Sequence, residues 1–110
     1  MTRDLPTNLL SDLPTASAAE QVDVLLSRGG LRIERIVSTG QASPPGFWYD
    51  QAQTEWVLLL AGSAALLIDG EATPRRLAAG DYALIPARVR HRVEWTDPAV
   101  PTIWLAIHAF

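Results

Sequence analysis

The sequence predicts an all-β protein, either a sandwich or a small antiparallel barrel. Short apolar segments recur at even spacing along residues 31–110, and turns rich in glycine and proline separate them. Asp69-Gly70 lies between two of these segments and is a strong signal for a tight β-hairpin. Many short strands joined by such turns are typical of sandwiches and barrels.

Composition limits the chain to one globular domain. With 110 residues there is room for a single core, and 48% hydrophobic with 19% charged residues suits a globular protein. No cysteine is present, which excludes disulfides and thiolate metal sites. The net charge of −3 argues against nucleic acid as a partner. Because residues 1–10 do not resemble a secretory signal and no apolar run approaches the roughly 20 residues that span a bilayer, we expect a cytoplasmic protein without a membrane partner.

The first 30 residues are predicted to form an extension that carries a short helix. Ser17-Ala-Ala-Glu20 fits a capping box, in which the serine and the glutamate satisfy each other's backbone donors. Val22, Leu25 and Leu26 then give an apolar face, and Gly29-Gly30 would end the helix. We therefore expect a helix over 17–27 that packs on a barrel formed by residues 31–110.

The remainder of the chain is predicted to be strands. Residues 31–34 alternate as a strand, and the alternation slips at Arg35-Ile36-Val37, which predicts a bulge. Residues 40–46 include two prolines and read as a loop. Further strands are predicted at 46–51, 55–61, 64–68, 81–85, 91–96 and 102–109.

The segment 55–61 is apolar on both faces, so both faces should be buried. One face would look into the barrel. The other needs a cover, which either the N-terminal helix or a second subunit could supply. The last strand is also apolar on both faces, and a homodimer is the commonest way to bury such surface. We therefore expect a homodimer.

The segment 91–96 alternates, and its register points to a pocket. Arg90, Arg92 and Glu94 form a charged face that must contact water, so His91, Val93 and Trp95 should point inward. A histidine at the mouth of a barrel is a candidate for binding a ligand.

The same alternation can be applied to the other strands. If Glu55 faces inward with Val57 and Leu59, an unbroken register places Tyr49, Gln51 and Gln53 inward too. A turn near Ala52 would instead bring Asp50 inward. Leu84 or Tyr82 should line the barrel. In the last strand both faces are apolar, so the register does not decide where His108 points.

Two stretches of the sequence resemble the motifs of small single-domain cupins. In the first, Gly46, Glu55 and Gly62 match, while Tyr49 and Gln51, or Trp48 and Asp50 with the longer spacing, stand where the family has histidines. In the second, Gly80, Pro86 and His91 match, while Arg88 replaces a glycine and Trp95 an asparagine. The resemblance covers roughly residues 31–110 and implies a double-stranded β-helix, or jelly-roll barrel.

The resemblance further implies a divalent metal bound by three histidines and a glutamate. Only Glu55 and His91 carry over directly. Gln51 could add an amide oxygen, Tyr49 could coordinate or hydrogen-bond nearby, and an inward His108 would complete a two-histidine, one-carboxylate set. The metal could be iron, manganese, nickel or zinc, and the enzyme would then resemble the dioxygenases, isomerases or lyases among the cupins.

Each of these residues also has a purely structural interpretation. His91 could be a hydrogen-bonded histidine at a barrel rim, Glu55 a solvated carboxylate, and His108 a packing residue. The loss of the two family histidines favours a metal-free barrel that binds or senses a small molecule. A third interpretation is an interaction module that acts through its dimer surface. The leading prediction is a small-molecule-binding barrel with a pocket formed by Tyr49, Gln51, Val57, Val93 and Trp95 and a divalent metal held by Gln51, Glu55, His91 and His108.

Overall fold

The computed structural model describes residues 8–15 and 18–110, and within these residues it contains eight strands and no helix. The prediction of an all-β protein is confirmed. In chain order the strands are β1 (Gln21–Arg28), β2 (Leu31–Ser38), β3 (Thr54–Ala61), β4 (Ser63–Ile68), β5 (Arg75–Ala78), β6 (Tyr82–Ile85), β7 (His91–Thr96) and β8 (Thr102–Ala109).

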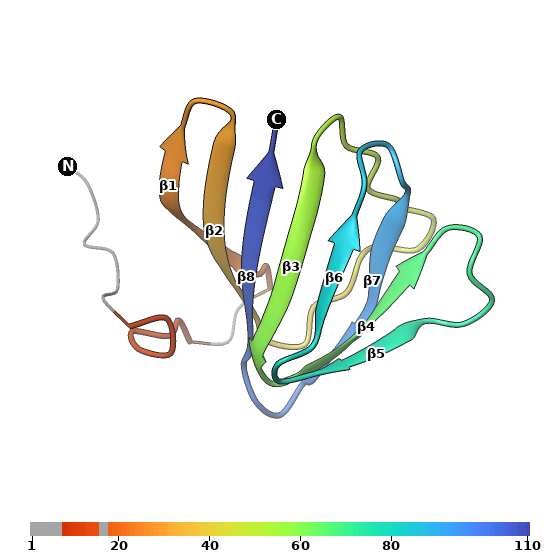
Figure 1. The fold of residues 1–110 in the computed structure, drawn as a ribbon. Helices are drawn as coiled ribbons and strands as arrows, with labels where there is room; N and C mark the ends of the chain where they lie inside the picture. Colours follow the sequence, from red (N-terminus) through yellow and green to blue (C-terminus); the bar gives the residue numbers. More distant parts are fainter. Residues whose placement is uncertain (1–7, 16–17) are drawn as a thin grey trace.

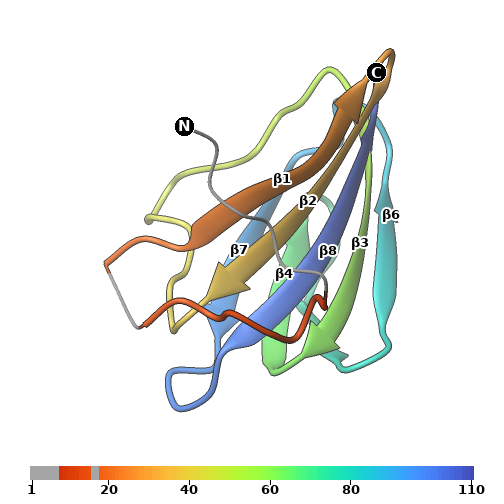
Figure 2. The same ribbon diagram turned by 90° about the vertical axis from the view of Figure 1, so that its left-hand side faces the viewer.

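The strands form two antiparallel sheets that face each other (Figure 1). The larger sheet has the order β1-β2-β8-β3-β6, and the smaller has the order β5-β4-β7. The loop between β2 and β3 runs across the open side of the barrel, beside β7 (Figure 2). It joins β7 through a single bridge, Tyr49 to His91, where the sequence predicted a strand over 46–51. β5 was not predicted, and residues 69–74 connect it to β4.

The core lies between the sheets and confirms the inward register of β3. Val57 and Leu59 are 6% and 0% exposed. The register of β6 follows from its pairing with β3, in which Val57 lies opposite Ala83. Ala83 and Ile85 are therefore buried, whereas Leu84 and Tyr82 point outward and are exposed. The expectation that Leu84 or Tyr82 lines the barrel was wrong by one residue.

The predicted N-terminal helix is wrong over its described part. Ser17 of the predicted capping box lies outside the described residues, and from Gln21 onward the segment forms β1, which pairs with β2. In β1, Val22 and Val24 share one face and Asp23 lies on the other, which is the alternation of a strand. The bulge predicted at residues 35–37 lies instead in β1, between Val24 and Leu26. No helix in the described ranges is long and apolar enough to cross a membrane.

A buried arginine attaches the N-terminal segment to the outer face of the large sheet. Arg35 is 0% exposed, and its Nε and Nη2 donate to Asp23 at 3.1 and 2.8 Å. Its remaining N–H groups donate to the backbone carbonyls of Leu9, Ser11 and Asp12 at 3.3, 2.6 and 3.2 Å. All five donors of a guanidinium need partners when it is buried. The alternation of apolar and polar residues is therefore interrupted at Arg35 because Arg35 is buried in an ion pair, and the strand itself is regular.

We expect a homodimer that buries the outer face of β3 and β6. Trp56 and Leu58 of β3 are only half-buried there, and Leu84 and Tyr82 of β6 are 59% and 64% exposed. Exposed apolar surface of this kind marks interaction sites. Light scattering should give about twice the monomer mass of 12.0 kDa. A Tyr82→Arg variant should shift the mass toward the monomer, and a wild-type monomer at micromolar concentration would contradict the expectation.

Candidate functional site

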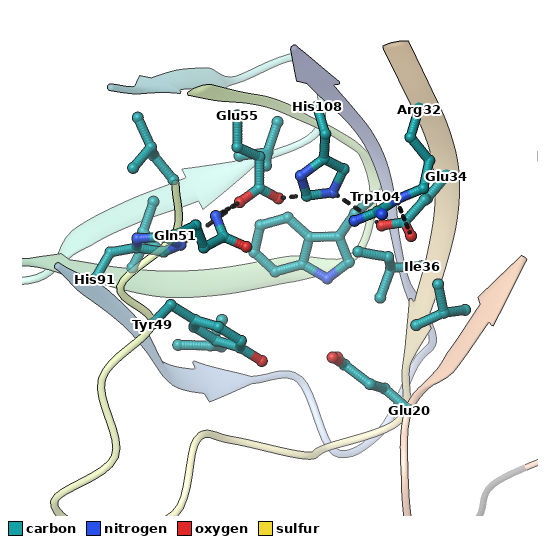
Figure 3. A pocket seen from close by; sticks show the side chains of 15 residues that line it. Glu20, Arg32, Glu34, Ile36, Tyr49, Gln51, Glu55, His91, Trp104 and His108 are labelled. Atoms are coloured by element: carbon teal, nitrogen blue, oxygen red, sulfur yellow. Dashed lines mark hydrogen bonds and ion pairs between the residues drawn. The ribbon is translucent and has the colours of Figure 1, made fainter. Parts of the chain in front are cut away.

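A cavity of about 230 Å³ lies between the two sheets. It brings together Tyr49, Gln51, Val57 and Val93 of the predicted pocket with Glu55, His91 and His108 of the predicted metal site (Figure 3). The other lining residues are Glu20, Val22, Arg32, Glu34, Ile36, Leu66, Ile85 and Trp104. The cavity therefore has apolar walls with one cluster of polar side chains.

Trp95 does not line the cavity. A bulge in β7 leaves Glu94 without a partner on β4, so that Val93 pairs with Leu66 and Trp95 with Ala65. The extra residue reverses the alternation, and Trp95 points outward with 38% exposure, 5.7 Å from the guanidinium carbon of Arg76. His91 and Val93, which precede the bulge, keep the predicted inward direction.

Glu55 and His91 form the centre of the polar cluster. Glu55 is the second residue of β3 and His91 is the first of β7, on opposite sheets, and they are 8% and 4% exposed. The Oε1 atom of Glu55 lies 3.5 Å from Nε2 of His91 and accepts a 3.0 Å hydrogen bond from the amide of Gln51. A buried carboxylate is costly without partners, and these two neighbours supply them.

The tautomer of His91 follows from its second contact. Its Nδ1 lies 3.0 Å from the carbonyl oxygen of Val89, which can only accept. Nδ1 therefore carries a proton, and Nε2 is the atom directed at Glu55. The ring also stacks on Tyr49, with centroids 5.3 Å apart, which restricts its rotation.

The pair has opposite pKa shifts. Burial alone would raise the pKa of Glu55, but the hydrogen bonds from His91 and Gln51 and the nearby charges of His108 and His91 lower it. Burial would lower the pKa of His91, but its bonds to Glu55 and Val89 and the charge of Glu55 raise it. The structure thus favours an ionised Glu55 beside a protonated His91.

His108 faces the cavity, which settles the direction that the sequence left open. It is 4% exposed and lies opposite Glu55 in the pairing of β8 with β3. The amide nitrogen of Gln53, 3.3 Å from Nδ1, can only donate, so Nδ1 accepts and Nε2 carries a proton. Nε2 donates to Glu34 at 3.0 Å and lies 3.9 Å from Glu55.

Sequence reasoning missed three polar residues of the cavity, Glu34, Arg32 and Glu20. Glu34 and Arg32 lie on one face of β2 with Ile36, and the alternation of residues 31–34 was the signal that could have identified them. Glu20 precedes β1 and accepts a 3.0 Å hydrogen bond from Ser38. The Ser38 hydroxyl in turn accepts from the indole of Trp104 at 3.1 Å, which fixes Glu20 at the edge of the cavity.

The donor set does not fit a four-ligand metal centre. The amide nitrogen of Gln51 faces Glu55, and both ring nitrogens of His108 are engaged by Glu34 and Gln53. Glu55 and His91 are the two strong donors left facing each other. Among the residues that the structure describes, no group of three or more His, Asp or Glu side chains is arranged to hold a metal.

Comparison with known proteins identifies the family. Residues 35–108 match the family profile described as a cupin domain. The chain belongs to the cupin family. A structure from Ralstonia eutropha JMP134, named as a candidate mannose-6-phosphate isomerase, superposes with a TM-score of 0.92 at 50% identity and covers 96% of this chain and 98% of its own. A cupin superfamily protein from Desulfitobacterium hafniense DCB-2 has a TM-score of 0.77 at 16% identity over 100% of this chain and 94% of its own. No curated protein matches this cupin.

The glycines of the cupin motifs have a conformational explanation here. Gly46, Gly62 and Gly80 have φ angles of 78°, 85° and 94°. Arg88, which stands where the motif has a glycine, has a φ of 66°. The fold thus requires a left-handed residue at this corner, and this chain places an arginine in a conformation that suits glycine.

We expect Arg88→Gly to leave the stability of this cupin unchanged or to raise it by up to about 1 kcal/mol. The left-handed conformation costs a non-glycine residue about 1–2 kcal/mol, and the greater freedom of glycine in the unfolded chain offsets part of that gain. The lost ion pair to Asp50 is exposed, at 3.4 Å, and contributes little. Denaturant unfolding measures the change, and Arg88→Ala, which keeps the strain, is the matched control. A clear loss of stability in Arg88→Gly alone would contradict the expectation.

Proposed function

We propose that this cupin binds a small hydroxy-carbonyl compound and isomerises it by proton transfer. The observation that carries the proposal is the contact between Glu55 and His91, a buried carboxylate and a buried imidazole with opposite pKa shifts inside an apolar cavity. Groups whose environments push their pKa values apart are suited to act as base and acid in one reaction.

The reaction needs no group beyond the side chains of the cavity. Glu55 takes the proton from the carbon next to the carbonyl, and the C–H electron pair moves into the new C=C bond of an enediolate. The protonated Nε2 of His91 donates a hydrogen bond to the carbonyl oxygen as it gains charge. Return of the proton to the former carbonyl carbon, with a proton moved between the two oxygens, completes an isomerisation in which atoms and electrons balance.

The remaining polar residues support these roles. Gln51 and His91 hold the carboxylate of Glu55 in place, and the carbonyl of Val89 together with the ring of Tyr49 holds His91. His108 lies 3.9 Å from Glu55 and is itself fixed by Glu34. The similarity to the Ralstonia protein, whose name refers to an isomerase of an aldose phosphate, supports the same class of reaction.

A divalent metal is the second candidate, and one observation favours it. Histidines that bind metals usually donate their other ring N–H to a backbone carbonyl, as His91 does to Val89. A metal between Glu55 and His91 would need further ligands, and recruiting His108 would break its contact with Glu34. Titration calorimetry with manganese, iron(II), nickel and zinc on wild type and His91→Ala tests this candidate.

The test of the proton transfer is solvent-deuterium incorporation into mannose and mannose 6-phosphate, followed by NMR. With at least one of the two sugars we expect incorporation and ketose formation that persist in the presence of a chelator. Glu55→Gln and His91→Asn should each lower the rate by about 10²–10⁴-fold, the usual contribution of a general acid or base. Arg88→Gly, which lies outside the cavity lining, is the control. Incorporation that survives in Glu55→Gln, or that the chelator abolishes, would contradict the proposal.

A further inference from the structure

The charges around the cavity point to the class of substrate. We propose that the cavity takes an uncharged hydroxy-carbonyl compound, such as a free sugar, and rejects phosphate esters. This inference rests on the proposed function, because it names the substrate of the same site. The substrate of this cupin would then differ from mannose 6-phosphate, the phosphorylated sugar in the name of the Ralstonia protein.

The described lining of the cavity carries three carboxylates and one guanidinium, those of Glu20, Glu34, Glu55 and Arg32. The charge of Arg32 is already paired within the lining. Its Nε lies 3.1 Å from Glu34, and its guanidinium carbon lies 5.2 Å from the centre of the Phe110 ring. A phosphate inside the cavity would therefore find its one arginine already neutralised.

Among the described residues no other arginine lines the cavity, and the imidazole of His91 already faces Glu55. The sequence has no lysine, and its nine basic residues are arginines. Three of them lie around the start of β7, outside the cavity lining, and each has partners there. Arg88 pairs with Asp50, Arg90 with Asp69, and Arg92 with Glu94 and the carbonyls of Ser43, Pro44 and Phe47.

Glu20 adds a third carboxylate to the lining, at the edge of the cavity. It lines both this cavity and a second one of about 190 Å³, and Figure 3 shows its carboxylate on the side of Tyr49 and Trp104. Its hydrogen-bond donor is the neutral hydroxyl of Ser38. Burial of the carboxyl end raises the pKa of Glu20, against the lowering effect of Ser38, and the charge of Glu55 raises it further. The carboxylate of Glu55 would repel the phosphate of a bound ligand just as it disfavours a negative charge on Glu20.

The experiment compares mannose, mannose 6-phosphate and inorganic phosphate by titration calorimetry on wild type and on Glu34→Gln. In wild type we expect mannose to bind at least about tenfold more tightly than its phosphate ester, because the ester would bring its negative charge beside the carboxylates of a partly buried lining. In Glu34→Gln, Arg32 loses its carboxylate, and affinity for phosphate should rise by at least about tenfold. Glu94→Gln, which removes the partner of Arg92 outside the lining, is the matched control and should gain none.

The possible outcomes distinguish failure of the charge selection from failure of the proposed isomerase function. Mannose 6-phosphate that binds wild type as tightly as mannose overturns the inference, and its isomerisation would leave the proposed function intact. If neither sugar binds wild type but Glu34→Gln gains phosphate, the charge selection stands and the sugar isomerase fails. If Glu34→Gln gains no affinity for phosphate, or gains no more than Glu94→Gln, the pairing of Arg32 does not control selection and the inference fails.

Discussion

Adding one methyl group at Gly62 is expected to lower the free energy of unfolding by about 2–5 kcal/mol, the sum of a left-handed backbone cost and a steric overlap. Gly62 connects β3 to β4 with a φ of 85°. A Cβ there would overlap Oγ1 of Thr102 and lie 2.6 Å from its Cα atom, and Thr102 is 0% exposed at the start of β8. Because backbone atoms form part of the obstruction, a change of rotamer cannot relieve it. Thermal and denaturant unfolding of Gly62→Ala measure the loss.

Gly70 supplies the control for this prediction. Its φ of 93° is close to that of Gly62, but a Cβ there would meet no atom within 4 Å. Gly70→Ala therefore carries the conformational cost without the overlap. We expect it to destabilise the protein by only about 1–2 kcal/mol. Equal losses in the two variants would show that the contact with Thr102 is relieved by movement of β8.

The spacing of strands and turns predicted an all-β fold, and the resemblance to cupins brought Glu55 and His91 into one candidate site. Gly62 and Gly80 have backbone conformations that few other residues adopt. Glycines at these two positions are therefore recognisable in the sequence as turn signals. His91 begins a strand that alternates as far as Val93, and its predicted inward direction agrees with its burial. The inward direction assumed for Glu55 agrees with its burial as well. Local pattern and tertiary structure agree at these positions.

The errors occur where tertiary pairing overrides a local pattern. Residues 21–28 carry apolar residues at helical spacing, yet they form an edge strand because β2 offers a partner and Asp23 is bound by Arg35. Trp95 was misplaced because alternation does not reveal a bulge one residue before it. The alternation of residues 31–34 could have placed Glu34 in the cavity, but its contact with His108, 74 positions along the chain, is contained in no local pattern.

The ion pair of Glu55 and His91 predicts a maximum in stability at mildly acidic pH. The folded-state pKa of Glu55 is lowered, so its contribution is present above its unfolded value of about 4.3 and is lost as the pH falls through the lower folded value. The pKa of His91 is raised, so its contribution is present below about 6.5 and is lost as the pH rises through the higher folded value. Both contributions are complete only between about pH 4.3 and 6.5.

Glu55→Gln should remove this maximum. The amide preserves the shape of the side chain but leaves His91 buried without a charged partner, so burial would then lower the pKa of His91. We expect a loss of about 1–3 kcal/mol near pH 5.5, which shrinks as the pH rises above the folded pKa of His91. Denaturant unfolding across the pH range measures both curves, and Glu71→Gln, in an exposed ion pair with Arg75, is the control. If the curves of wild type and Glu55→Gln ran parallel, the two groups would not be coupled in the folded state, and the acid–base roles assigned to them would lose their physical basis.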